Sequence, residues 1–137
     1  MESMKIVEIV RLQSPAIELD TPMKTVINLL LANNTTGLPV IDKEHKVVGF
    51  LSEKDCIEKM LIAAYHCDRN IPTVNDAMTT KVVCFTPEDS LVEVAKLMTT
   101  STPKIYPVVE NGKYIGIITR TDVLKALFTK TEHCFGY

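Results

Sequence analysis

Two seven-residue segments share a pattern of residue types that suits the binding of a phosphate and a sugar. They are Gly49-Phe50-Leu51-Ser52-Glu53-Lys54-Asp55 and Gly116-Ile117-Ile118-Thr119-Arg120-Thr121-Asp122. In each segment a glycine and two apolar residues precede a hydroxyl residue, and an aspartate follows three positions later. A hydroxyl at a helix N-terminus can contact a phosphate. A carboxylate one turn further on can accept hydrogen bonds from a ribose diol.

The same pattern also has a purely structural explanation. A hydroxyl residue followed three positions later by an acid is typical of a capping box. Ser52 or Thr119 would then accept a hydrogen bond from an unpaired backbone N–H, and the acid would lie at the positive end of the helix dipole. The two roles are compatible, because a cap can release its backbone partner to a ligand. The motif alone therefore leaves both a cap and a binding site open.

The two segments belong to a repeat that covers most of the chain. At an offset of 68 residues, the apolar helix positions Met23, Val26, Ile27 and Leu30 fall on Leu91, Val94, Ala95 and Met98. Both sets have the i, i+3, i+4, i+7 spacing of one helix face. After residues 42–45 the offset becomes 67, so that Gly49 falls on Gly116. The lost residue lies in a predicted tight hairpin turn at Asn111-Gly112.

Each copy predicts the order strand, helix, strand, strand, helix. The first strands are predicted at residues 16–19 and 82–85, the first helices begin near 20–22 and 87–89, and the hairpins are at 38–41 with 47–51 and at 106–109 with 114–118. The second helices carry apolar faces at Ile57, Met60, Leu61 and Ala64 and at Leu124, Leu127 and Phe128. Met60 and Met98 are expected to fill the core. One such unit cannot bury both faces of its sheet. We therefore predict an α/β (α+β) fold of two βαββα units packed sheet to sheet.

Composition and boundaries narrow the class of protein. We place the two units at residues 7–62 and 74–130, with a connector at 63–73 and a C-terminal tail at 131–137. Lys and Arg number 15 against 17 Asp and Glu, and the net charge of −2 gives no basic excess for binding nucleic acid. No apolar run reaches the roughly 20 residues of a membrane-spanning helix, and the N-terminus does not read as a signal peptide. We expect a cytoplasmic protein that binds neither nucleic acid nor membrane.

Neither a metal site nor a catalytic site is predicted. The chain's four cysteines form no C-x-x-C pair, and His66-Cys67 and His133-Cys134 each supply only two adjacent donors. Packing is the expected role of Cys84, with a redox role as the alternative. No pairing of a nucleophile with a base and no Gly-x-x-x-x-Gly-Lys-Ser/Thr loop is recognisable. An enzyme is therefore not expected.

The repeat, the Leu38-Pro39-Val40-Ile41-Asp42 strand and both Gly-x-x-Ser/Thr-x-x-Asp segments resemble a tandem pair of cystathionine-β-synthase-type (CBS) domains, or Bateman module, over about residues 7–130. The resemblance implies two units related by pseudo-twofold symmetry, with two clefts for adenosyl ligands. AMP, ADP and ATP lead that ligand class, S-adenosylmethionine and NAD also belong to it, and none is an obligatory cofactor. In the family the aspartate typically holds the ribose hydroxyls and the Ser or Thr approaches the phosphates.

By the same resemblance, each cleft combines residues of both copies. One cleft is expected to contain Asp122, Thr119 and Arg120 with Pro15, Ala16, Ile17, Thr36 and Gly37. The other is expected to contain Asp55 and Ser52 with Val82, Val83, Cys84, Lys104 and Ile105. Backbone groups of such strands can read an adenine edge, while apolar side chains cover the faces of the ring.

The two clefts are not expected to be equivalent. Arg120 offers a phosphate a fixed charge and planar, paired donors. Glu53 holds the same position in the first copy and would repel a phosphate, with Lys54 or Lys104 as a partial offset. We therefore predict that the Asp122 cleft binds nucleotide more tightly than the Asp55 cleft.

The resemblance also implies a regulatory role in contact with other chains. Such pairs commonly dimerise through helix faces such as those of residues 57–64 and 124–128, so we expect a homodimer that reports its ligand to a regulated protein. The main alternative is a module with degenerate clefts that serves protein interaction or oligomerisation without a ligand. A nucleic-acid-binding module and a metal or redox sensor are further alternatives. The former requires a basic stripe, and the scattered Lys and Arg residues form none.

Overall fold

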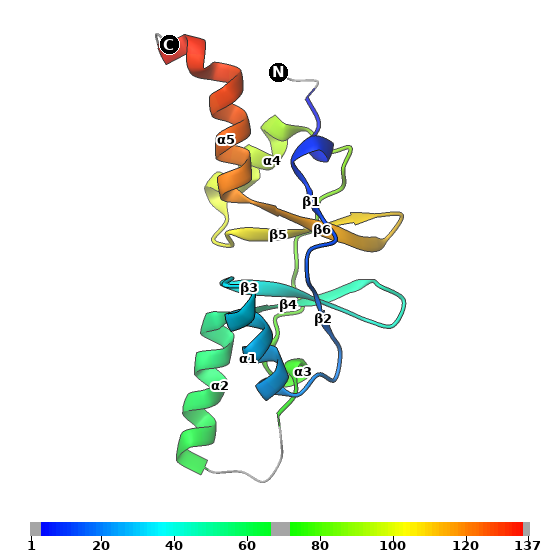
Figure 1. Ribbon diagram of the computed structural model, residues 1–137, viewed down its shortest axis with the longest axis vertical. Helices are drawn as coiled ribbons and strands as arrows, with labels where there is room; N and C mark the ends of the chain where they lie inside the picture. Colours follow the sequence, from blue (N-terminus) through cyan, green and yellow to red (C-terminus); the bar gives the residue numbers. More distant parts are fainter. Residues whose placement is uncertain (1–3, 67–71, 136–137) are drawn as a thin grey trace. The chain divides into compact units, whose positions relative to one another are not determined.

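A computed structural model describes residues 4–66 and 72–135, and the chain divides into two compact units (Figure 1). The central unit is Pro15–Val82, and the terminal unit combines the described parts of Met1–Ser14 and Val83–Tyr137. The class is mixed α and β, as the sequence predicts, with a three-stranded sheet in each unit. Within the described residues, no helix has the length and apolar character needed to cross a membrane.

The central unit combines a short parallel strand with an antiparallel hairpin. Its elements are β2 (Ile17–Glu18), α1 (Met23–Ala32), β3 (Gly37–Ile41), β4 (Val47–Ser52), α2 (Glu53–His66) and α3 (Val74–Ala77). Strand β2 runs parallel to β3, and β3 pairs antiparallel with β4. Figure 1 shows α1 and α2 on the same face of this sheet. The first motif therefore lies where β4 ends and α2 begins.

The terminal unit has a similar hairpin with two helices, but its third strand comes from the N-terminal part of the chain and is antiparallel. Its elements, with η denoting a 3₁₀ helix, are η1 (Ile6–Ile9), β1 (Arg11–Leu12), α4 (Leu91–Thr100), β5 (Ile105–Glu110), β6 (Lys113–Thr119), α5 (Arg120–Thr131) and η2 (Glu132–Phe135). Strand β6 pairs antiparallel with both β1 and β5. In Figure 1, α4 and α5 lie on one face of the sheet. The second motif lies at the junction of β6 and α5.

Each copy of the repeat contributes its first segment to the sheet and core of the other copy. Ile6 and Val74 coincide at the 68-residue offset, and both are 0% exposed. Ile6 lies in the core of the terminal unit, which holds most of the second copy, and Val74 lies in the core of the central unit, which holds most of the first copy. Arg11 pairs with Ile117, and Thr79 forms the equivalent bridge to Phe50. Residues 5–14 and 73–82, the leading segments, therefore belong to one copy of the repeat by sequence and to the compact unit of the other copy by structure.

These leading segments explain why each motif begins with glycine. A Cβ atom on Gly116 would lie 2.2 Å from the carbonyl oxygen of Arg11. One on Gly49 would lie 2.5 Å from the Met78 sulfur and 2.9 Å from the carbonyl oxygen of Thr79. These separations are shorter than van der Waals contact, so the neighbouring segment can approach only a residue without a side chain. The glycine of the motif is thus required by strand packing.

One predicted strand is absent, and a proline explains the difference. Residues 82–85 form no strand, although Phe85 makes a parallel bridge to Val108. In the first copy the ladder continues because the N–H of Leu19 donates to the carbonyl of Ile41. Pro87 stands at the position equivalent to Leu19 and has no N–H to donate. The strand of the second copy is therefore reduced to a single bridge.

Asn111 and Gly112 both have positive φ, 54° and 79°, which confirms the tight turn. The connector predicted at 63–73 starts within α2, and its residues 67–71 lie outside the described residues. In the predicted tail, α5 ends at Thr131 and η2 follows at once.

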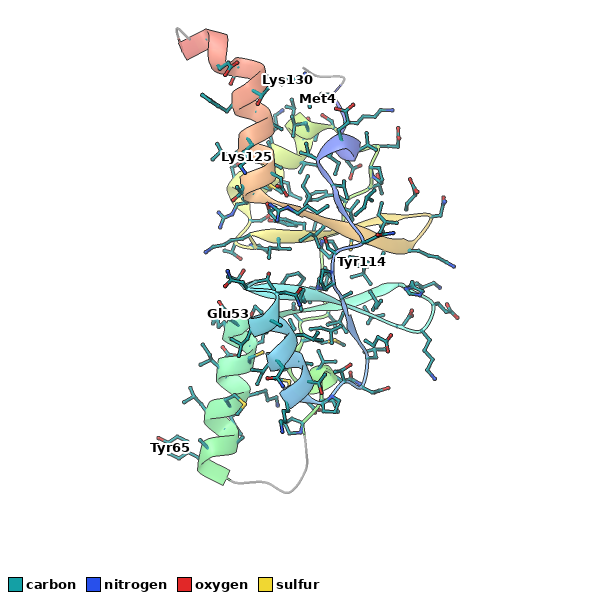
Figure 2. All side chains as sticks on the ribbon, in the orientation of Figure 1. Met4, Glu53, Tyr65, Tyr114, Lys125 and Lys130 are labelled. Atoms are coloured by element: carbon teal, nitrogen blue, oxygen red, sulfur yellow. The ribbon has the colours of Figure 1, made fainter. Side chains whose placement is uncertain are left out.

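Each unit has its own apolar core, and Figure 2 shows the side chains that build it. In the terminal unit the rings of Phe85 and Tyr106 pack with centroids 5.1 Å apart. Met98 is 5% exposed, as expected for a core residue. The same expectation for Met60 is wrong, because this side chain is 48% exposed and the buried residue of α2 is Cys56. In Figure 2, Tyr65 also points away from the unit.

Candidate functional site

The second motif forms a helix cap at the start of α5. The backbone N–H of Asp122 donates to the hydroxyl oxygen of Thr119 at 3.1 Å, and the backbone N–H of Thr119 donates to Oδ2 of Asp122 at 3.2 Å. This is the reciprocal geometry of a capping box. The structural role predicted for Thr119 and Asp122 is therefore confirmed, and their assignment to a ligand site stays a prediction.

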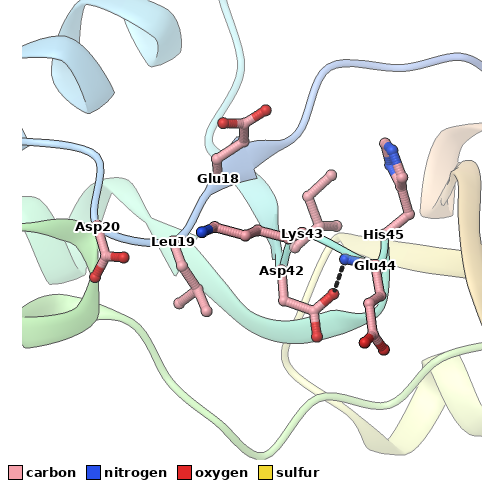
Figure 3. Close-up of a pocket in the computed structure, with 8 residues that line it drawn as sticks. Glu18, Leu19, Asp20, Asp42, Lys43, Glu44 and His45 are labelled. Carbon is pink, nitrogen blue, oxygen red and sulfur yellow. Dashed lines mark hydrogen bonds between the residues drawn. The ribbon is translucent and has the colours of Figure 1, made fainter.

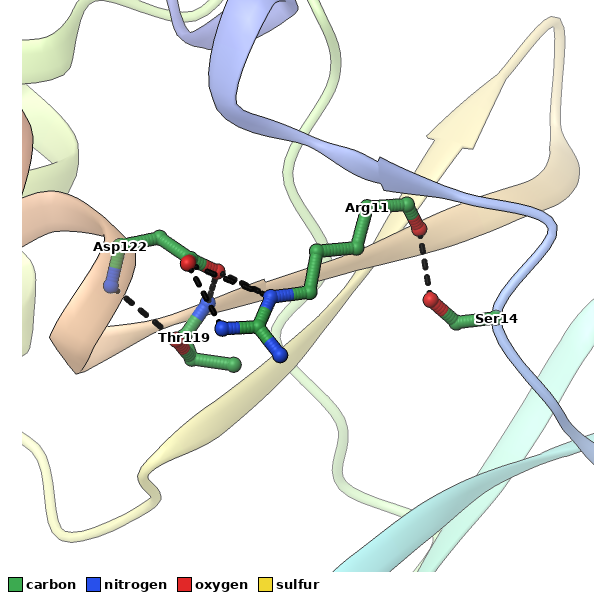
Figure 4. A network of polar contacts seen from close by, with 4 residues as sticks. All are labelled: Arg11, Ser14, Thr119 and Asp122. Carbon is green, nitrogen blue, oxygen red and sulfur yellow. Dashed lines mark hydrogen bonds and ion pairs between the residues drawn. The ribbon is translucent and has the colours of Figure 1, made fainter. Parts of the chain in front are cut away.

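Asp122 also binds a residue that sequence reasoning did not single out (Figure 4). Nε of Arg11 donates to Oδ2 at 2.9 Å and to Oδ1 at 3.2 Å, and Nη2 donates to Oδ1 at 2.8 Å. The side chain of Asp122 is 14% exposed and that of Arg11 54%. Arg11 is carried by β1, which the pairing with β6 places beside the motif.

The charges of this pair support each other. Burial acts to raise the pKa of Asp122, but hydrogen bonds from Arg11 and Thr119 and the positive charge of Arg11 outweigh it, so the pKa is lowered. The hydrogen bond to Asp122 and its negative charge raise the pKa of Arg11. Asp122 is therefore an ionised carboxylate at neutral pH, which suits hydrogen-bond donors such as hydroxyl groups.

The first motif forms the same cap at the start of α2. Oδ2 of Asp55 accepts from the backbone N–H and the hydroxyl of Ser52, both at 2.9 Å, and the N–H of Asp55 donates to the Ser52 hydroxyl at 3.2 Å. Within the described residues, Oδ1 of Asp55 accepts no hydrogen bond from a side chain. Thr79 lies beside the first motif as Arg11 lies beside the second, and among the described residues it forms only backbone bonds, to Phe50. Asp55 and Asp122 thus take part in the same type of helix cap, each in its own unit, and differ in their charged neighbours.

The other predicted site residues divide between the two units, and four of them contact the motif of their own unit. Gly37 pairs with Ser52, and the N–H of Glu53 donates to the carbonyl of Thr36 at 2.9 Å. Ile105 pairs with Thr119, and the N–H of Arg120 donates to the carbonyl of Lys104 at 3.0 Å. Pro15, Ala16, Ile17 and Val82 belong to the central unit, and Val83 and Cys84 to the terminal unit. The predicted clefts combine residues of both units, and these groupings stay predictions.

Cys84 and Cys56 do not have the surroundings of reactive thiols. Burial raises the pKa of Cys84, which disfavours the thiolate that a redox role requires. Burial, together with the negative charges of Asp55 and Glu53, also raises the pKa of Cys56. Cys67 lies outside the described residues. In the described parts of the chain, no three His, Cys, Asp or Glu side chains are placed to hold a metal ion.

A separate acidic pocket of about 560 Å³ lies in the central unit, between the end of β2 and the β3–β4 turn (Figure 3). Oδ1 of Asp42 accepts hydrogen bonds from the N–H groups of Glu44 and Lys46, at 2.8 and 3.0 Å. This carboxylate therefore shapes the turn. The residues that line the pocket include none of the predicted site residues; they are Glu18, Leu19, Asp20, Ile41, Asp42, Lys43, Glu44 and His45.

Solved structures share this fold over nearly the whole chain. CBSX2 of Arabidopsis thaliana in complex with AMP superposes with a TM-score of 0.77 at 25% identity, covering 93% of this chain and 98% of that one. The CBS domain pair of protein MJ0100, in complex with 5-methylthioadenosine and S-adenosyl-L-methionine, superposes with a TM-score of 0.73 over 93% of this chain and 98% of that one. At 22% identity, the second likeness concerns the fold alone.

The sequence comparisons agree with the fold. Uncharacterized protein MJ1225 of Methanocaldococcus jannaschii is 33% identical over 101 residues, which make up 74% of this chain and 35% of that protein. The chain thus spans about a third of the length of this relative. The sequence profile of the CBS domain matches residues 6–62 and again residues 74–129. The chain belongs to the CBS domain family, of which it carries two copies.

Proposed function

We propose that this chain is a regulatory module that binds an adenosyl ligand, with AMP, ADP or ATP as the first candidates, and signals its presence to a partner protein. The observation that carries the proposal is the repeated placement of a hydroxyl and a carboxylate at the start of a long helix, once in α2 and once in α5. The helix N-terminus and the hydroxyl suit a phosphate, and the carboxylate suits a ribose diol.

The hydrogen-bonding capacity left at Asp55 supports this proposal. An ionised carboxylate has about four lone-pair positions. The cap uses two of them, both on Oδ2, and within the described residues no side chain donates to Oδ1. Asp55 can therefore accept a ribose hydroxyl without losing its cap. We assign the remaining cleft residues as the resemblance implies, with each cleft drawing on both units.

The ligand class rests on related proteins. CBSX2 forms a complex with AMP, and the domain pair of MJ0100 forms one with two adenosyl compounds. The first is 25% identical to this chain over nearly its full length. An adenosine moiety is common to all these ligands, and it is the part that a ribose-binding carboxylate recognises. The proposal therefore commits to the adenosyl group and leaves the phosphate count to experiment.

A thermal-shift panel of AMP, ADP, ATP, S-adenosylmethionine and NAD, followed by calorimetry, tests the proposal. A ligand at about 100 times its Kd adds roughly 2.7 kcal/mol to the free energy of unfolding, and for a chain of this length the Tm rises by roughly 3–6 °C. Asp55→Ala and Asp122→Ala are each expected to remove one binding site. Asp76→Ala is the matched control, because Asp76 closes the capping box of Thr73 in α3 outside both motifs.

Two outcomes would contradict the proposal. One is the absence of a shift with every adenosyl ligand of the panel. The other is a loss of binding in Asp76→Ala as large as that in Asp55→Ala and Asp122→Ala, because the two motif aspartates would then act only through the stability of their caps. Retained binding in the control, with one site lost in each motif variant, supports the proposal.

The phosphate-binding part of the proposal concerns Arg120. Its side chain is exposed at the first position of α5, where the helix dipole also favours an anion. Arg120→Ala is expected to weaken AMP binding far more than adenosine binding, as measured by calorimetry. Lys125→Ala removes another exposed positive charge further along the same helix and is the control. Equal losses of AMP and adenosine affinity in Arg120→Ala would contradict a phosphate contact.

The second candidate function is an interaction or oligomerisation module that binds no ligand, and the exposed apolar side chains of α2 favour it. Ile57, Met60 and Leu61 are all exposed, and they line a groove of about 340 Å³ between α1 and α2. Contiguous apolar surface of this kind marks an interaction site. A homodimer formed through α2 and α5 is compatible with either candidate, so the ligand panel is the test that separates them.

A further inference from the structure

The guanidinium of Arg11 binds the carboxylate of Asp122, to which the proposed function assigns the ribose hydroxyls. Its Nε and Nη2 atoms donate to Oδ2 and Oδ1 of Asp122 at 2.9 and 2.8 Å, and Nε also lies 3.2 Å from Oδ1. The N–H of Thr119 donates to Oδ2 at 3.2 Å. These four contacts match the roughly four lone-pair positions of a carboxylate. Both hydroxyls of a ribose can therefore bind Asp122 only after Arg11 has left.

We propose that Arg11 is an internal competitor of the ligand at Asp122, which the ribose hydroxyls must displace. The inference rests on the proposed function and adds that Arg11 sets the ligand affinity of the Asp122 site but not of the Asp55 site. Thr79 takes the place of Arg11 beside the first motif, and its bonds to Phe50 are made by backbone atoms. The Asp55 site therefore has no such competitor among the described residues.

The geometry allows the guanidinium to leave while the backbone of β1 stays in place. Arg11 pairs with Ile117, and the N–H of Gln13 donates to the carbonyl of Ile115 at 2.9 Å. The hydroxyl of Ser14 donates to the carbonyl of Arg11 at 2.7 Å. These bonds hold the strand without help from the Arg11 side chain. Because that side chain is half exposed, water can solvate the displaced guanidinium.

The experiment measures the Kd of adenosine by calorimetry in an Asp55→Ala background, so that only the Asp122 site is titrated. Arg11→Met removes the competing donors and keeps much of the side-chain length. Adenosine is uncharged, so loss of a positive charge has no direct Coulombic effect on it. Lys5→Met is the matched control, because Lys5 lies in the same leading segment and pairs with Glu88 instead of Asp122.

We expect Arg11→Met to bind adenosine about two- to five-fold more tightly, since a half-exposed bidentate pair contributes at most about a factor of that size. Lys5→Met should leave the Kd unchanged. Adding Asp122→Ala in this background should abolish measurable adenosine binding both with and without Arg11→Met, because no binding carboxylate then remains.

The remaining outcomes separate this inference from the proposed function. Equal adenosine affinity with and without Arg11, together with loss of binding in Asp122→Ala, would overturn the competition and leave the proposed function intact. Weaker AMP binding in Arg11→Met, with adenosine unchanged, would make Arg11 a phosphate ligand and would also overturn the competition. No adenosyl ligand bound with or without Arg11, even when Asp55 is present, would overturn the proposed function, and the competition with it.

Discussion

At the scale of single residues, Asp55 and Asp122 build the same cap in different charge environments. Both accept a backbone N–H three positions earlier, which is the local requirement of a capping box. Only Asp122 has a guanidinium on both carboxylate oxygens. The contrast between Arg120 and Glu53 predicts a difference in the binding of a ligand's phosphate. By our proposal, the contrast between Arg11 and Thr79 affects the binding of its ribose, in the opposite direction.

The lowered pKa of Asp122 predicts a pH-dependent contribution to stability. Above the ordinary aspartate pKa of 3.8 the ionised group is paired with Arg11 and stabilises the fold. As the pH falls through the lower pKa of the folded state, protonation removes that contribution. The stability difference between the wild type and Arg11→Met, measured by urea denaturation, should thus be constant near neutral pH and vanish in acid. Half exposure of Arg11 limits it to about 1 kcal/mol or less.

Lys5→Met provides the reference for this measurement, because it removes the same charge from the same segment without touching Asp122. Its stability relative to the wild type should not follow the titration of Asp122. A difference for Arg11→Met that stays constant down to acid pH would show that the Arg11 guanidinium does not stabilise the ionised Asp122.

The caps of this site could be predicted from sequence, whereas the contact of Arg11 could not. A capping box depends on residues three positions apart, so its pattern is visible in Ser52 and Asp55 and again in Thr119 and Asp122. Arg11 reaches Asp122 across 111 positions of sequence, and the repeat gives no hint of it because Thr79 differs in type. The repeat does extend back to Ile6 and Val74, which indicates that the segments that follow these residues correspond, but it does not indicate a contact between Arg11 and Asp122.

Among the elements, the packing of the leading segments depends on Gly116 and Gly49. We predict that alanine at these two positions lowers the stability of the fold by unequal amounts. Gly116→Ala would place a Cβ 2.2 Å from a backbone oxygen of Arg11, which can move only with β1. Gly49→Ala first meets the flexible end of Met78, with the Thr79 oxygen at 2.9 Å. We expect Gly116→Ala to lower the free energy of unfolding by about 1–3 kcal/mol, and more than Gly49→Ala does, in urea denaturation.

Adenosine binding by the same variants would connect this prediction with the role of Arg11. Displacement of β1 in Gly116→Ala should separate Arg11 from Asp122, whereas Gly49→Ala leaves that pair in place. A Gly116→Ala variant as stable as the wild type would contradict the close packing of β1 on β6.

The helices and hairpins of the fold could be predicted, but the exchange of leading segments could not. Helix α1 and helix α4 have ten residues each and a clear apolar periodicity, and the hairpin turn has its Asn-Gly signature. The two-residue strand β1 and the single bridge at Thr79 are too short to leave a period in the sequence. Their positions are fixed by long-range packing of Ile6 and Val74, which local patterns do not encode.

In the molecule as a whole, most of the large apolar side chains that are exposed among the described residues lie on the two long helices, α2 and α5. On α2 the exposed apolar residues are Ile57, Met60, Leu61, Ile62 and Tyr65, and on α5 they are Leu124 and Phe128. These side chains belong to neither core cluster, whereas Cys56 and Val123 are the buried ones among the described residues of the two helices. Such faces are costly to expose to water, and a second copy of the chain offers matching surfaces.

We therefore predict that the chain is a homodimer in sedimentation equilibrium and that Leu61→Glu or Leu124→Glu shifts it toward monomer, because burial of a charge in an apolar interface is strongly unfavourable. Val7→Glu is the control, since Val7 is also exposed, at 51%, but belongs to η1. Circular dichroism should show all three variants folded, because none of these side chains is buried in its own unit. A wild-type monomer, or dissociation caused equally by Val7→Glu, would contradict an interface formed by α2 and α5.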